Sequence, residues 1–275
     1  MFRRRLKHLS LILLLCAALA GGCAKVRPSN NRDWSPDQAV LATAEYSKDD
    51  RHVTIRNVRF CNYRTSDDYD VRHEDRTYDL ADLRTVDFIR CPFPEMPELA
   101  HTMLSFGFAD RDYLGVSVEI RKEKGETYNP LLATANQFEI MYVVGDERDL
   151  IGLRTNYRLN DVYLYPTNAT STDVRRLFDH VMARVNKLAK KPEFYNTLTN
   201  NCTTNIVAHV NQLTPNRIPY DYRVLLPGYS DRLAYDLGLL KSRLSFEETR
   251  QAARVTDVAY QAREAPDFSM AIRRR

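Results

Sequence analysis

One cysteine of this sequence stands where a helix is expected to begin. Cys202 lies in the segment TLTNNCTTNIVAHVNQL, where the polar residues Asn200 and Asn201 precede it and an apolar pattern of helical period follows. At the start of a helix, unpaired backbone N–H groups and the helix dipole favour the thiolate and lower the pKa of a thiol. The same N–H groups could stabilise a developing oxyanion. The pattern predicts a nucleophilic thiol, and the alternative is a small cysteine buried in the core.

A nucleophilic cysteine needs a base and a group that orients the base, and His101 is the best-placed histidine. It lies on the first arm of a predicted hairpin, residues 100–122, in which apolar and polar residues alternate on both arms. If Phe108 pairs with Leu114, His101 falls on a polar face opposite Arg121. The sequence therefore predicts that His101 takes the proton of the thiol.

The same polar face offers candidates for the orienting group. In this register Glu119 is the diagonal neighbour of His101, and Ser117 also lies on this face. A carboxylate beside a histidine fixes the tautomer of the ring and supports its charged form. The alternative is a solvent-exposed sheet face that happens to carry a histidine.

The remaining histidines favour structural roles. His209 lies seven residues after Cys202, on the same stripe of the helix, and is interpreted as a helix-surface residue. His180 lies in an amphipathic helix and His52 opens a strand, so both are expected to be structural, whereas His73 is expected to be exposed.

The sequence contains five cysteines, and their spacing limits the metal and redox chemistry that they could perform. Their spacing contains no CxxC pair, which argues against a structural zinc site, and no other metal or cofactor motif appears. Cys16 and Cys23 belong to the N-terminal segment described next. An oxidising compartment would permit a disulfide between Cys61 and Cys91 and leave Cys202 as the odd thiol.

The N-terminus carries the pattern of an export signal. Basic residues within positions 3–7 precede an apolar stretch, residues 9–19, which at about 11 residues is shorter than the roughly 20 that span a bilayer. Small residues at 20–22 then precede Cys23, as lipoprotein processing requires. Residues 1–22 are therefore expected to be a signal peptide and Cys23 a lipidated anchor to membrane lipid. The alternative is an ordinary cleaved signal followed by a chance cysteine. Ala24 is not an aspartate, which in a two-membrane bacterium favours the outer membrane.

The basicity of the chain belongs to this signal. Its four basic residues account for the whole formal net charge of +4, so the charge gives no support to a nucleic-acid partner. Removing the signal leaves about 250 residues, enough for one large domain with its own core. No later stretch is apolar for 18 residues, so no transmembrane helix is expected after the signal.

Hydrophobic periodicity predicts an α+β protein, with an antiparallel sheet in the first half and helices in the second. We expect a polar tether over 23–36, a domain over 37–240 and a helical tail over 241–275. The expected elements are a short helix at 37–47, a strand at 52–63 with a possible bulge, a solvated loop at 64–80, a strand at 83–89, a break at the prolines 92–97, the hairpin at 100–122, strands at 137–145 and 150–166, and helices at 172–189 and 202–212.

Several long runs of the sequence together resemble one protein family. It is the N-terminal periplasmic domain of Lnb-type lipoprotein N-acyltransferases, and the resemblance covers roughly residues 34–240. The runs that carry it are AHTMLSFGF (100–108), SVEIRKEKGE (117–126), FEIMYVVGDERDLIGLRT (138–155), VYLYP (162–166) and PEFYNTLTNNCTTNI (192–206).

The resemblance implies a fold and a site. The family looks like a circularly permuted relative of papain-like and NlpC-type thiol enzymes, in which a strand histidine comes before a helix-start Asn-Cys. Those positions match His101 and Asn201 with Cys202, and the third polar member matches Glu119, with Ser117 as an alternative. The residues expected to contact the substrate or its oxyanion are Asn201, Ser117 and Arg121.

Two departures from the family limit what can be carried over. Full-length acyltransferases of this type have membrane-spanning helices after the domain, and no such stretch follows here. In addition, Cys61 and Cys91 fall where the family is not expected to have cysteines, which favours a local disulfide between them.

Three functional hypotheses follow. The first is a lipid-anchored enzyme on the periplasmic face of the cell envelope, which moves an acyl group from a phospholipid to a lipoprotein amine without a cofactor. The second keeps the thiol chemistry but cleaves cell-wall peptides. The third is a catalytically silent envelope lipoprotein that binds a partner.

Overall fold

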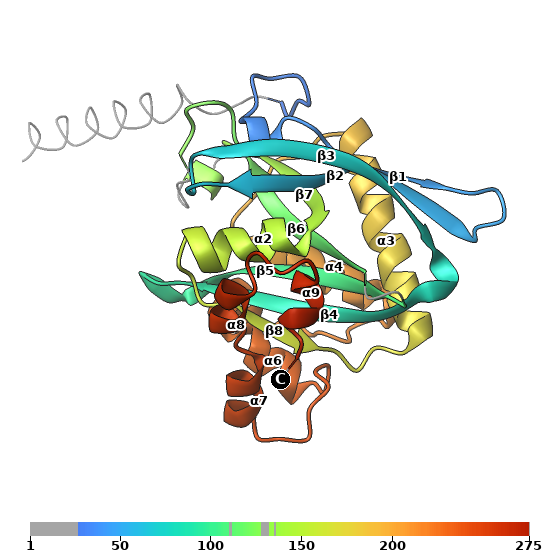
Figure 1. Ribbon diagram of the computed structural model, residues 1–275, viewed down its shortest axis with the longest axis vertical. Helices are drawn as coiled ribbons and strands as arrows, with labels where there is room; N and C mark the ends of the chain where they lie inside the picture. Colours follow the sequence, from blue (N-terminus) through green and yellow to red (C-terminus); the bar gives the residue numbers. More distant parts are fainter. Residues whose placement is uncertain (1–26, 110–111, 128–131, 135, 275) are drawn as a thin grey trace, which may run out of the picture.

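A curved sheet of eight strands forms the centre of the computed structural model, which describes residues 27–109, 112–127, 132–134 and 136–274 (Figure 1). The strand order is β1-β2-β7-β6-β5-β4-β8. The eighth strand, β3, lies outside this order and pairs with β2. All neighbours are antiparallel except β2 and β7, which pair in parallel through Arg59 and Gly145. The strands are β1 (Thr43–Tyr46), β2 (His52–Tyr63), β3 (Tyr69–Asp79), β4 (Leu83–Phe93), β5 (Met96–Phe108), β6 (Tyr113–Arg121), β7 (Glu139–Asp146) and β8 (Tyr163–Pro166).

Helices cover both faces of this sheet. They are α2 (Glu147–Gly152), α3 (Ser171–Lys190), α4 (Cys202–Leu213), α5 (Tyr222–Leu225), α6 (Ser230–Asp236), α7 (Phe246–Ala253), α8 (Thr256–Gln261) and α9 (Phe268–Ala271). A π-helical turn, η4 (Leu153–Tyr157), continues α2 directly. Short 3₁₀ turns occupy Pro36–Gln38, Leu80–Asp82, Leu132–Thr134 and Pro227–Tyr229. Within the described residues, no helix combines the length and the apolar character that crossing a membrane requires.

The larger core lies between the sheet and helices α3 and α4. The predicted amphipathic helix at 172–189 is confirmed as α3, which begins after Thr170, whose side chain accepts a hydrogen bond from the N–H of Asp173. Its apolar stripe is buried, and Phe178 packs edge-on against Phe106 of β5 with ring centroids 5.1 Å apart. This packing fixes α3, and the neighbouring α4, against the apolar face of the β5–β6 hairpin.

The opposite face of the sheet is covered by α2 and the C-terminal helices α8 and α9. The residues beyond 241, expected to be a tail, bury Val255, Ala259, Phe268 and Ile272 against strand side chains. Arg273 reaches further and pairs with two buried carboxylates, those of Asp87 on β4 and Glu147 on α2, at 2.7 and 2.6 Å. The C-terminal segment is therefore part of the fold.

The β5–β6 hairpin is confirmed, but its register differs from the expected one by two residues. Phe106 pairs with Leu114 and Leu104 with Val116, whereas we expected Phe108 to face Leu114. A shift of two keeps every side chain on its predicted face, because side chains alternate with a period of two along a strand. The same register, extended along the two strands, brings Glu119 rather than Arg121 opposite His101.

Other segments depart from the expected elements. The charged segment predicted as a solvated loop contains β3, an edge strand whose half-exposed surface accommodates alternating charged side chains. The first half of the strand predicted at 150–166 is instead helical, because Asp146 caps α2 and acidic residues occupy its first turn.

The N-terminal residues also differ from the expected elements. Residues 37–47, expected to form a short helix, form a 3₁₀ turn and β1. Residues 27–36, expected to belong to a tether, pack against the domain and bury Trp34.

The mixed α+β class, with a mostly antiparallel sheet packed on helices, is confirmed. The strand at 52–63 is also confirmed, with its bulge between Ile55 and Val58. The predicted signal peptide and lipidation site at Cys23 lie outside the described residues.

Candidate active site

The candidate site lies in a fork between β5 and β6. The two strands pair only as far as Met103 and Ser117, beyond which β5 stays paired with β4 and β6 with β7. A pocket of about 210 Å³ is lined by both diverging strand ends, by η4 and by the start of α4. We call it the Cys202 pocket, and its lining includes Cys202, His101, Glu119, Arg154 and Arg158.

Cys202 is the first residue of α4, as the sequence predicted. Asn201 caps the helix: its side chain accepts from the N–H of Thr204 at 2.8 Å, and the Thr204 hydroxyl accepts from the N–H of Asn201 at 2.8 Å. The N–H groups of Cys202 and Thr203 have no acceptor among the described residues. They form the positive end of the helix dipole beside the sulfur. Cys202 itself is 6% exposed.

The side-chain amide of Asn201 is fully engaged in the loop. Its oxygen caps α4, and its nitrogen donates to the carbonyl of Thr197 at 2.6 Å. Although Asn201 lines the pocket, this arrangement leaves the backbone N–H groups of Cys202 and Thr203 as the donors best placed for an oxyanion.

The neighbours of the two candidate residues hold their elements together. Thr102, which follows His101 on β5, and Thr203, which follows Cys202 on α4, share a buried hydrogen bond of 3.1 Å between their hydroxyls. This bond joins the histidine strand directly to the cysteine helix, across 101 residues of sequence.

His101 is oriented by a relay of two residues. Its Nε2 lies 2.7 Å from Oγ of Ser117, which in turn donates to Oε1 of Glu119 at 2.7 Å. Because the Ser117 proton goes to Glu119, Oγ must accept from Nε2–H, which leaves Nδ1 of a neutral ring as the basic nitrogen. The Nε2–Oε1 distance is 3.9 Å, so Glu119 acts on the ring through Ser117.

Arg154 completes the electrostatics of the relay. It projects from η4, is 3% exposed, and donates to Oε1 of Glu119 at 3.0 Å and to the carbonyl of Leu150 at 2.7 Å. Burial alone would raise the pKa of Glu119, but the charge of Arg154 outweighs it and holds that pKa below its usual value. Burial and the same arginine lower the pKa of His101 to about 3. Glu119 is therefore ionised and His101 neutral.

Cys202 and His101 line the same pocket without touching. No hydrogen bond joins the sulfur to the ring in the part of the chain that the structure describes, and the recorded contact of Sγ is the Thr203 hydroxyl at 3.8 Å. Catalytic hydrogen bonds are often long in unliganded enzymes and shorten when substrate binds.

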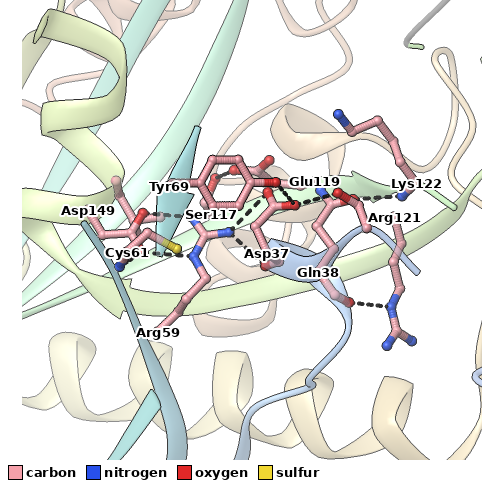
Figure 2. A network of polar contacts seen from close by, with 12 residues as sticks. Asp37, Gln38, Arg59, Cys61, Tyr69, Ser117, Glu119, Arg121, Lys122 and Asp149 are labelled. Atoms are coloured by element: carbon pink, nitrogen blue, oxygen red, sulfur yellow. Dashed lines mark hydrogen bonds and ion pairs between the residues drawn. The ribbon is translucent and has the colours of Figure 1, made fainter. Parts of the chain in front are cut away.

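Arg121 does not lie across from His101. Its Nε donates to the carbonyl of Gln38 at 2.9 Å, and its guanidinium packs over the Trp34 ring at 4.1 Å. Figure 2 shows it beside a neighbouring network in which Arg59 pairs with Asp149 at 2.8 Å. Arg121 thus anchors the N-terminal segment to β6, and the expected substrate contact is corrected.

The expected disulfide between Cys61 and Cys91 is not formed. Both thiols are free and buried, on β2 and β4, strands that three others separate in the sheet. Strand neighbours lie about 4.8 Å apart, whereas a disulfide requires Cα atoms within about 7 Å. Burial raises the pKa of Cys61 to about 12 and that of Cys91 to about 11, which makes both thiols unreactive.

His209 is not on the helix surface. It is 3% exposed, and its Nε2 lies 2.8 Å from the hydroxyl of Tyr142, while its Nδ1 lies 2.7 Å from Nδ1 of His180. The Tyr142 hydroxyl donates onward to Asn205 of α4 at 2.9 Å. The two histidines therefore brace α4 against α3 and β7, behind the cysteine turn.

Sequence reasoning missed Arg154 and Arg158. Both were assigned to a strand, but the π-helical turn presents them to the pocket. Such turns recur at functional sites. The sequence did contain a signal for the helix, because Asp146 can cap a helix start. The apolar residues that follow were interpreted as a strand instead. Among the described residues, no cluster of three or more His, Cys, Asp or Glu side chains could hold a metal ion.

The fold and the site define a class: an α+β domain in which a helix-start cysteine and an oriented strand histidine share one pocket. A sequence model of the Lnb N-terminal periplasmic domain matches residues 69–228, more than half of the chain. The protein belongs to this family, whose members are periplasmic domains of the cell envelope. No curated protein and no solved structure matches the chain.

Proposed function

We propose that the protein is a thiol acyltransferase of the cell envelope that moves an acyl group from a phospholipid ester to a lipoprotein amine. The observation that carries the proposal is the His101–Ser117–Glu119 relay, which leaves Nδ1 of the neutral His101 ring as the proton acceptor, in a pocket that His101 shares with Cys202. A structural histidine does not require an ionised carboxylate held by a buried arginine.

In the first half-reaction, Nδ1 of His101 takes the Cys202 proton and the thiolate attacks the carbonyl carbon of the ester. The N–H groups of Cys202 and Thr203 hold the oxyanion of the tetrahedral intermediate. Collapse of the intermediate breaks the ester C–O bond, and the leaving alkoxide takes the proton from His101. The products are a Cys202 thioester and a lipid that has lost one acyl chain.

In the second half-reaction, the acceptor amine attacks the thioester. Nδ1 of His101 takes a proton from the amine as the new C–N bond forms, and the C–S bond then breaks. The thiolate recovers its proton from His101, which restores the free enzyme and releases the amide. Ser117 and Glu119 stabilise the imidazolium that forms in each half-reaction.

The architecture also supports a circularly permuted papain-like fold as part of this proposal. The histidine strand precedes the cysteine helix in the chain, and the two meet where β5 and β6 diverge. Lipidation at Cys23, which would place the domain on a membrane and favours the outer one, belongs to the same proposal.

Mass spectrometry of lipoprotein N-termini tests the function. A strain that lacks the gene should lose one N-acyl group, the wild-type gene should restore it, and Cys202→Ala should not. Cys61→Ser is the matched control, because that thiol is buried outside the pocket. Unchanged N-acylation in the deletion strain contradicts the proposal. If the deletion instead alters the cell-wall peptides, the result would favour a thiol enzyme that cleaves them.

A non-catalytic binding lipoprotein is the second candidate. It is favoured by one observation: no hydrogen bond joins the Cys202 sulfur to the His101 ring in the described residues. Under this hypothesis, Cys202→Ala restores the wild-type phenotype as fully as Cys61→Ser does.

A further inference from the structure

Several exposed apolar residues are direct neighbours of residues that line the Cys202 pocket. Leu159 is 74% exposed and stands between the lining residues Arg158 and Asn160. Leu198, 57% exposed, follows the lining residue Thr197. These two residues come from segments 39 residues apart in sequence, and the fold brings both segments to the lining of one pocket.

Two further segments extend this apolar rim. Leu226 is 37% exposed and lies between Leu225 and Pro227, both of which line the pocket. Met96 is 47% exposed at the β4–β5 turn, where it pairs with the lining residue Phe93. We call Met96, Leu159, Leu198 and Leu226 the apolar rim. Solvent-exposed apolar groups gathered at one opening are typical of surfaces that meet a membrane or a partner.

Two cations that line the Cys202 pocket have no partner among the described residues. Arg158 and Lys122 line the pocket, and neither side chain has a hydrogen bond or an ion pair with any residue that the structure describes. The other two arginines of the lining differ: Arg59 is bound to Asp149 and Arg154 to Glu119. Figure 2 shows the Lys122 side chain extending away from the surrounding network. Two cations that no described residue neutralises, close to an apolar rim, fit an anionic headgroup with its acyl chains.

The N-terminal segment reaches the fold on the same side. The N–H of Ser35 donates to the carbonyl of Lys122 at 2.9 Å, and Gln38 lines the pocket. The backbone carbonyl of Arg27, the first described residue, accepts a hydrogen bond from the guanidinium of Arg32. Arg32 also forms an ion pair with Glu139 of β7, the residue that pairs with Arg121 of β6 in the sheet. Cys23 is four residues before Arg27, so a lipid there would hold the fold within about 14 Å of its attachment point.

We propose that the mouth of the Cys202 pocket docks on an anionic phospholipid bilayer. The apolar rim enters the interfacial layer, and Arg158 and Lys122 bind headgroup phosphates. Docking brings the pocket opening to the level of the headgroups, so a single lipid can present its ester to the pocket without leaving the membrane. The proposal concerns a surface and is measured without turnover, so it can hold or fail independently of acyl transfer.

Vesicle sedimentation tests the docking surface without the lipid anchor. The protein is the chain from residue 23 onward with Cys23→Ser, which retains every residue that the structure describes. It should bind vesicles of equal parts phosphatidylcholine and phosphatidylglycerol, and bind pure phosphatidylcholine much more weakly. Equal binding to both vesicles, or binding to neither, overturns the proposal.

Variants locate the surface. Arg158→Gln with Lys122→Gln should weaken binding to the anionic vesicles roughly 25-fold, at about five-fold per cation, and leave binding to phosphatidylcholine unchanged. Leu159→Asn with Leu198→Ser should weaken binding to both vesicles at least ten-fold; asparagine suits position 159, where φ is +54°. Circular dichroism checks that each variant is folded.

Matched controls lie away from the pocket. Leu244 is 50% exposed and Lys241 is exposed, and neither lines the pocket, so Leu244→Ser and Lys241→Gln should bind like the parent protein. If these controls weaken binding as much as the rim variants, the surface lies elsewhere and the proposal is wrong. Cys202→Ala should bind vesicles like the parent protein. If the parent protein binds vesicles but N-acylation is unchanged in the deletion strain, the proposed enzyme is refuted and the docking surface stands.

Discussion

Thr102 and Thr203 share a buried hydrogen bond of 3.1 Å, and each stands one residue beyond a candidate catalytic side chain. The bond fixes how far the start of α4 lies from β5 at Thr102. It therefore sets the position of the Cys202 sulfur relative to the His101 ring, since both side chains line the pocket beside it.

A double-mutant cycle on this pair should show strong coupling. Thr203→Val alone leaves the Thr102 hydroxyl buried without its partner, so the free energy of unfolding should fall by about 1–3 kcal/mol. Thr102→Val with Thr203→Val removes both hydroxyls and should cost less than the sum of the single changes. Urea denaturation of the four proteins measures the coupling, and additive effects would mean that the bond contributes nothing.

Ser117→Ala should slow the chemistry of Cys202. Without the hydroxyl, Glu119 no longer fixes the His101 tautomer, so the rate of Cys202 alkylation by iodoacetamide at pH 7 should fall roughly 10- to 100-fold. The assay reports Cys202 in a Cys23→Ser background, because burial raises the pKa of Cys61 and Cys91 to about 12 and about 11. An unchanged alkylation rate would show that the relay does not act on the thiol.

Arg273→Ala should destabilise the protein severely. It leaves the carboxylates of Asp87 and Glu147 buried without their cation, a loss of about 3–5 kcal/mol in the free energy of unfolding. Arg274→Ala is the control, because that side chain is 64% exposed and its ion pair with Asp267 should contribute less than about 1 kcal/mol. Similar denaturation midpoints for both variants would contradict this role of Arg273.

Stability should fall as the pH is lowered from about 6.5 towards 3. Burial, reinforced by neighbouring positive charges, lowers the pKa of both His101 and His209 to about 3, whereas unfolded histidine titrates near 6.5. In this window the unfolded chain binds more protons, so each histidine removes about 1.4 kcal/mol of stability per pH unit. His209→Gln should reduce the slope of stability against pH by that amount in urea melts between pH 4 and 6, and an unchanged slope would mean that His209 is already charged in the fold.

The features of the site that could be predicted from sequence are those determined by local chemistry. The start of α4 at Cys202 follows from a polar cap before an apolar helical stripe. The shared face of His101, Ser117 and Glu119 follows from strand alternation, and it survives the two-residue error in register because that error is even.

The remaining features depend on contacts between distant segments. Arg154 enters the site because η4 turns it towards Glu119, a residue 35 positions away. His209 is buried because α3 and β7 supply His180 and Tyr142 as partners. The charged strand β3 forms because β2 offers an edge to pair with. The hydrophobic periodicity of one segment does not indicate which distant residues will contact it, so none of these contacts could be predicted from the sequence.

The position of Arg273 also implies an order of events during folding. Asp87 and Glu147 are synthesised long before residue 273, so the sheet around α2 cannot close at low cost until the last helix arrives to neutralise them. The early strands can pair with one another, but the face of the sheet beneath α8 and α9 cannot pack fully until these helices have been synthesised. This delay would keep that side of the domain loosely packed until residue 273 has been synthesised.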